Sequence, residues 1–84
     1  MNYTVLILRR AQKELARLPL GIYERTKEAI WNLGNDPKPP GCRKLAGREG
    51  WRIRVGDYRI IYEIDPAQHS VTVLHVGHRR DVYR

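Results

Sequence analysis

The first half of the chain spaces its apolar residues as a helix does. After a short β-prone stretch at residues 3–8, apolar side chains at positions 8, 11, 15 and 18 recur three and four residues apart among charged and polar ones. This period predicts an amphipathic helix that Pro19 closes. A second helical pattern covers residues 22–33 and ends at Gly34-Asn35. The short link between the two patterns predicts an antiparallel helical hairpin.

The second half of the chain alternates apolar and polar residues with a period of two. Three such stretches cover residues 51–55, 58–64 and 70–76, and Gly56-Asp57 separates the first two. A two-residue loop of this kind predicts a β-hairpin whose turn needs a positive φ at its first position. The pattern predicts an α+β fold in which an N-terminal strand and the helical hairpin pack on one face of a small antiparallel sheet. At this length, residues 1–84 are expected to form one domain.

The hairpin loop fixes which residues share a face of the sheet. A loop at Gly56-Asp57 pairs Arg54 with Arg59, and Arg52 then lies diagonally across from Arg59. One face receives apolar residues that helices can cover, and the other receives the three arginines with Ile61 and Glu63. Like charges in cross-strand positions destabilise a hairpin by up to about 1 kcal/mol. The concentration of arginines therefore favours a functional role over a solvated surface.

The next loop predicts a further pairing. A five-residue loop at 65–69 pairs Ile64 with Ser70 and places His75 opposite Arg59. Val71 and Val73 are then expected beside Ile61, as an apolar flank to the basic face. Such a flank suggests a protein partner in addition to a phosphate-bearing one.

The positive net charge of the chain indicates a polyanion as a further partner. Sixteen Lys+Arg against nine Asp+Glu give a formal net charge of +7, and twelve of the sixteen cations are arginines. Arginine presents a planar fork that grips phosphate through two hydrogen bonds. The C-terminal stretch 77–84 adds three more arginines together with Tyr83, an aromatic that can stack on bases. Nucleic acid is the leading partner class.

Several classes of protein are excluded or disfavoured. No apolar run approaches the ~20 residues that span a bilayer, and the N-terminus lacks a signal-peptide pattern, so a cytoplasmic protein is expected. The single cysteine, Cys42, excludes an internal disulfide. The carboxylates are scattered rather than clustered, so no metal or cofactor is predicted.

Metal-free cleavage of RNA remains open, because RNA supplies its own nucleophile in the 2′-hydroxyl. Arginines can stabilise the charge that develops on the phosphate, and a tyrosine or histidine can move the proton. Neighbouring arginines lower the pKa of a tyrosine because they favour the phenolate. Such a reaction leaves a 2′,3′-cyclic phosphate and cannot occur on DNA.

The run GWRIRVGDYRIIYEID at residues 50–65, with KLAG before it and VGHRRDVY after it, resembles the RelE branch of the RelE/ParE toxin superfamily. The resemblance covers essentially the whole chain. It implies a RelE-like fold and the toxin of a type II toxin–antitoxin module, which cuts mRNA in the ribosomal A site. It also implies an acidic, RelB-like antitoxin that wraps the toxin, with operator DNA contacted only through that antitoxin.

The resemblance also assigns residues. The catalytic positions of the family fall on Arg52, Arg54, Arg59, Arg79 and Tyr83. Arginine replaces lysine at 52 and 54 and is a poorer proton carrier, because its pKa stays above ~12. His78 is therefore a second candidate for the acid or base. Contacts to RNA or the ribosome are expected from Arg43, Lys44, Arg48 and Arg80.

Two alternatives remain beside this reading of the sequence. A ParE-like toxin would share the fold but poison DNA gyrase. A non-catalytic RNA- or ribosome-binding module would explain the basic face alone.

Overall fold

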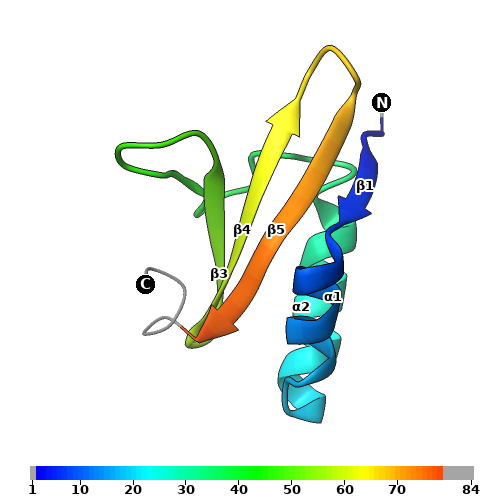
Figure 1. Ribbon diagram of the computed structural model, residues 1–84, viewed down its shortest axis with the longest axis vertical. Helices are drawn as coiled ribbons and strands as arrows, with labels where there is room; N and C mark the ends of the chain where they lie inside the picture. Colours follow the sequence, from blue (N-terminus) through cyan, green and yellow to red (C-terminus); the bar gives the residue numbers. More distant parts are fainter. Residues whose placement is uncertain (1, 79–84) are drawn as a thin grey trace.

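The computed structural model describes residues 2–78, which form two helices and one sheet (Figure 1). In chain order the elements are β1 (Thr4–Ile7), α1 (Arg9–Ala16), α2 (Leu20–Asn32), β2 (Arg43–Lys44), β3 (Trp51–Val55), β4 (Tyr58–Asp65) and β5 (Ser70–His78). Both helices lie on the same side of the sheet, as Figure 1 shows. The α+β fold predicted from the sequence is confirmed. No helix among the described residues is long and apolar enough to cross a membrane.

The sheet is mixed, whereas an antiparallel one was predicted. Its strand order is β1-β5-β4-β3-β2, and β1 runs parallel to β5 while the other neighbours are antiparallel. A period of two identifies a strand but does not say which strand lies beside it. The two-residue strand β2 was not predicted at all, because two residues are too few to show a period.

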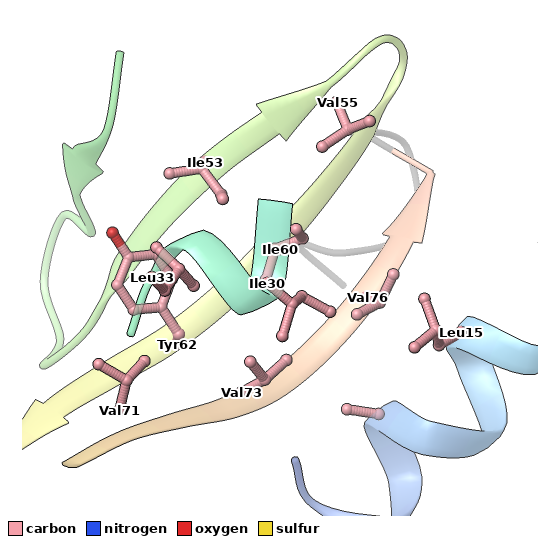
Figure 2. Packing of buried hydrophobic residues seen from close by; sticks show 11 residues of the cluster. Leu15, Ile30, Leu33, Ile53, Val55, Ile60, Tyr62, Val71, Val73 and Val76 are labelled. Atoms are coloured by element: carbon pink, nitrogen blue, oxygen red, sulfur yellow. The ribbon is translucent and has the colours of Figure 1, made fainter. Parts of the chain in front are cut away.

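The core lies between the helices and the sheet (Figure 2). Leu15 of α1 faces Val76 of β5, Ile30 of α2 lies beside Ile60 of β4, and Ile30 and Ile60 are almost fully buried. Burying each side chain of this size contributes about 1.5–3 kcal/mol. The helical period therefore places the helices on the sheet, and the sheet offers its apolar face to them.

The predicted β3–β4 hairpin is confirmed in its loop and in its pairing. Gly56 has a φ of 60°, which is the left-handed conformation that the first turn position requires. Arg54 pairs with Arg59, and Val55 pairs with Tyr58.

The predicted β4–β5 pairing is wrong, because the loop is shorter and β5 contains a bulge. Asp65 pairs with Ser70, which moves Ile64 opposite Val71. The pairing then shifts by one more residue between Ile61 and Tyr62, so that Arg59 lies opposite Gly77 and not His75.

The shorter loop between β4 and β5 also corrects the expected apolar flank. Val71 and Val73 are fully buried in the core under the helices and do not lie beside Ile61. Ile61 packs instead with Leu45 and Leu74 on the opposite face of the sheet. We call this face, which the helices do not cover, the open face.

The linker between α2 and β2 is attached to the sheet. The Tyr62 hydroxyl donates a hydrogen bond of 2.7 Å to the Pro37 carbonyl oxygen, and the Lys38 ammonium lies 4.8 Å from the centre of the Trp51 ring. Burial, reinforced by Cys42, raises the pKa of Tyr62, so its phenol stays protonated and keeps donating. These contacts fix the path that leads the chain to β2.

Candidate functional site

Four arginines from three strands line one small cavity. The cavity has a volume of about 110 Å³, and its lining residues are Gly41, Arg43, Arg52, Ile53, Arg54 and Arg59. We call it the arginine cavity. No acidic side chain is among its lining residues in the part of the chain that the structure describes.

The pairing of three strands brings these arginines together. Arg52 and Arg54 are two residues apart on β3 and so share a face, and Arg59 of β4 pairs with Arg54. Arg43 of β2 pairs with Arg52 from the other side of β3. The Nε of Arg54 donates a 3.1 Å hydrogen bond to the Gly56 carbonyl oxygen, which ties this side chain to the hairpin turn.

The electrostatics of the cavity suit an anion. Arg52 and Arg59 are half-buried, whereas Arg43 and Arg54 are exposed, so charge extends from within the cavity to its rim. Directly opposed like charges cost stability in a hairpin. Guanidinium groups also form short bidentate hydrogen bonds to phosphate oxygens, and a bound phosphate would relieve their mutual repulsion.

The open face also carries an apolar cluster around Ile61, with Leu45 and Leu74 in place of the predicted Val71 and Val73. Leu45 and Ile61 are buried, and the partly exposed Leu74 packs against them. Ile61 pairs with Arg52 across β3 and β4, so this apolar cluster borders the arginine cavity. The open face thus combines a basic cavity with a neighbouring apolar cluster, of which Leu74 is partly exposed.

Some predicted site residues do not join the cavity. Lys44 pairs with Trp51, which packs on the helix side of the sheet. Lys44 and Arg43 therefore lie on opposite faces of β2. Arg48 is exposed between β2 and β3 and does not line the cavity.

The structure also separates His78 from the arginines. His78 pairs with Tyr58, and their rings meet edge to face with centroids 5.5 Å apart. Tyr58 in turn pairs with Val55, a core residue under the helices, whereas Gly77 is the residue in line with Arg59.

The remaining predicted residues, Arg79, Arg80 and Tyr83, lie outside the described residues. Within residues 2–78, no three His, Cys, Asp or Glu side chains are grouped so that they could hold a metal ion.

Sequence reasoning missed one glycine that lines the cavity and one that pairs with a cavity arginine. Gly41 lines it with a φ of 89°, and Gly77 faces Arg59 across β4 and β5. The proline-rich linker pointed to Gly41 only as a loop residue. Gly77 could be found only with the correct register of β5.

Comparison with known proteins places the molecule in a class. Residues 5–83 match the family model described as ParE toxin of type II toxin–antitoxin system, parDE. The chain belongs to this family of toxins.

Individual relatives agree with that assignment. Toxin RelG of Mycobacterium tuberculosis is 38% identical, with 100% of this chain and 99% of the relative covered. Toxin RelE of the same organism is 36% identical over 98% of this chain and 87% of the relative.

Solved structures share the fold along nearly the whole chain. A chain of the RelBE2 toxin–antitoxin complex of M. tuberculosis matches with a TM-score of 0.83 at 30% identity, covering 96% of this chain and 95% of that one. A chain of the archaeal RelE–RelB complex of Pyrococcus horikoshii OT3 matches with a TM-score of 0.83 at 31% identity, covering 98% and 100%. The RelE-like fold is therefore confirmed.

Proposed function

We propose that this toxin cleaves mRNA in the A site of the ribosome, in the cytoplasm, by attack of the RNA 2′-hydroxyl on the neighbouring phosphate. The observation that carries the proposal is the arginine cavity, where Arg52, Arg54 and Arg59 converge from two strands. The similarity to toxins named RelG and RelE supports it.

In this mechanism the arginines stabilise the negative charge that develops on the phosphate oxygens. The attack gives a crowded phosphorane whose oxygens carry more negative charge than the starting phosphate. Arg59 faces the β3 arginines across the hairpin, so the group can hold the phosphate from two strands. Donors fixed before the reaction stabilise such charge without having to reorganise.

Proton transfer needs a group other than these arginines. A base must take the 2′-hydroxyl proton and an acid must protonate the 5′-oxygen that leaves, giving a 2′,3′-cyclic phosphate and a 5′-hydroxyl. Tyr83 is the proposed base, assigned by resemblance, and Arg79 joins the phosphate contacts. His78 is the weaker candidate, because it lies in line with Tyr58 and not with Arg59.

The reaction can be tested on translating ribosomes. Mapping of mRNA ends after incubation with the protein should show cuts within the A-site codon, and the 3′ ends should carry a cyclic phosphate. Free metal ions should not be needed, so a chelator should leave cleavage intact on ribosomes whose own Mg²⁺ demand is met. If the chelator abolished cleavage on such ribosomes and added Mg²⁺ restored it, the mechanism would be contradicted.

We further propose an acidic antitoxin as the partner that silences the toxin. The solved relatives include complexes of RelE with RelB, and the net charge of +7 suits an acidic segment. Leu74, the partly exposed member of the open-face cluster, offers such a segment an apolar contact on which to fold. High expression of the protein alone without any effect on growth would contradict a toxin of this kind.

A second candidate function is poisoning of DNA gyrase, because the matching family model is that of the ParE toxin of parDE. The two activities predict different damage in cells. Gyrase poisoning should produce a DNA-damage response with intact mRNA, whereas ribosomal cleavage should truncate mRNA and leave the DNA unbroken.

A further inference from the structure

Helix α1 reaches into the part of β5 that β1 leaves uncovered. The β1 pairing ends where Ile7 meets Val73, but β5 continues for five more residues to His78. At this edge the Val76 backbone N–H donates a 3.0 Å hydrogen bond to the Glu14 carboxylate, which takes the place of a strand partner.

The same carboxylate holds the neighbouring side chain. The His75 Nδ1 lies 2.8 Å from Glu14 Oε1, and the Arg10 Nη2 lies 3.0 Å from the His75 Nε2. Both nitrogens of the His75 ring therefore have a partner on α1, Arg10 at Nε2 and Glu14 at Nδ1. Glu14 and His75 are both mostly buried, with side-chain exposures of 24% and 17%.

These contacts lie at the bulge that sets the register of β5. The pairing shifts between Ile61 and Tyr62, opposite the segment from Val73 to His75. Leu74 lies on the open face and Gly77 lies in line with Arg59, three residues further on, because the bulge adds a residue. A one-residue slip in a strand moves every following side chain to the other face.

We propose that Glu14 is a positioning residue of the active site. By binding the His75 ring and the Val76 N–H, it holds the bulge and keeps Gly77 in line with Arg59. Gly77 and His78 are the last two residues of β5, so the same contacts set the face of the sheet that each of them occupies. Without the bulge, Val76 would leave the core for the face of the arginines, and His78 would exchange faces too. The inference rests on the proposed cleavage reaction and adds a residue that touches neither the arginine cavity nor the phosphate.

The test compares Glu14→Ala and Glu14→Gln with Glu28→Ala, an exposed carboxylate on α2 that serves as the control. Glutamine keeps one acceptor oxygen for the Val76 N–H, whereas alanine keeps none. Small displacements of catalytic groups cost up to about a hundredfold in rate, so Glu14→Ala should slow single-turnover cleavage at least about tenfold. Ribosome binding should stay unchanged, and Glu14→Gln should recover part of the rate.

A second measurement reports the register itself, without reference to activity. Cross-strand NMR contacts between Arg59 and Gly77 should weaken in Glu14→Ala, while those between Ile53 and Ile60 persist. If this contact or the cleavage rate stays at the wild-type value in Glu14→Ala, the positioning role is wrong.

Arg59→Ala separates the two proposals in the same assay. If Arg59→Ala abolishes cleavage and Glu14→Ala does not, the proposed function stands and the positioning role falls. If Arg59→Ala cleaves normally, the proposed function itself falls. Should Glu14→Ala not fold, Glu14→Gln carries the test, and a wild-type rate together with a wild-type His75 environment overturns the inference.

Discussion

The two faces of the same sheet are built for different tasks. On the face under the helices, Ile53, Ile60 and Val76 are almost fully buried and meet side chains from α1 and α2. On the open face, alternate positions of the same strands carry Arg54 and Arg59. Most of the apolar packing thus lies on the face under the helices, and the clustered arginines are confined to the other face. The comparison shows how a small domain can carry an unfavourable cluster of cations, because its core does not depend on that cluster.

The sharpest test of this division uses two neighbours on β4. Arg59→Ala should lose a charge-assisted donor pair worth about 3 kcal/mol in the transition state, which is a little over a hundredfold in cleavage rate. Its unfolding free energy should stay close to that of the wild type, because the side chain lies on the face that the helices do not cover. Ile60→Ala should instead cost about 2–5 kcal/mol of unfolding free energy. Single-turnover cleavage and denaturant unfolding measure the two effects, and equal loss of stability in both variants would break the comparison.

A second prediction asks which residue moves the proton. Tyr83→Phe keeps the ring but loses the ionisable hydroxyl, so the chemical step should slow by about a hundredfold while ribosome binding persists. His78→Gln should be mild, because His78 lies in line with Tyr58. Single-turnover rates at several pH values decide between them. If His78→Gln slowed cleavage strongly and Tyr83→Phe slowed it little, His78 would be the residue that moves the proton.

A third prediction concerns the apolar part of the open face. If an antitoxin segment covers Leu74, then Leu74→Ala should weaken the complex by about tenfold, the loss of one buried leucine contact. The control is Leu20→Ala, because Leu20 is 77% exposed at the start of α2 and lies outside the open-face cluster. Titration of the toxin with its antitoxin measures both, and an equal effect of the two substitutions would remove the open face from the interface.

The smallest expected effect lies on the helix side. Tyr62→Phe loses the hydrogen bond to Pro37 and should cost about 1 kcal/mol of unfolding free energy at neutral pH. Burial raises the pKa of Tyr62, so the folded state favours the neutral phenol and should lose stability as the pH rises above the ordinary tyrosine value of about 10. Unfolding measured at neutral and alkaline pH should show a steeper loss for the wild type than for Tyr62→Phe.

The sequence by itself determined both helices, four of the five strands of the sheet and the β3–β4 hairpin. These elements depend on local features, namely the period of the apolar residues and the turn at Gly56-Asp57. The hairpin register followed from the loop length, so the clustering of Arg52, Arg54 and Arg59 was also predictable. The membership of the toxin family rests on motifs that are likewise contiguous in the chain.

The tertiary structure decided what depends on partners far apart in sequence. The parallel pairing of β1 with β5, and the short β2 that brings Arg43 to the cavity, have no local signature. The bulge in β5 moved Gly77 opposite Arg59, and the shorter loop between β4 and β5 placed Val71 and Val73 in the core. Glu14 looked like an ordinary surface charge of an amphipathic helix, and only its packing on the uncovered edge of β5 gives it a role. A periodic pattern specifies which side of an element is buried, but the neighbours that bury it are chosen by the packing of the whole chain.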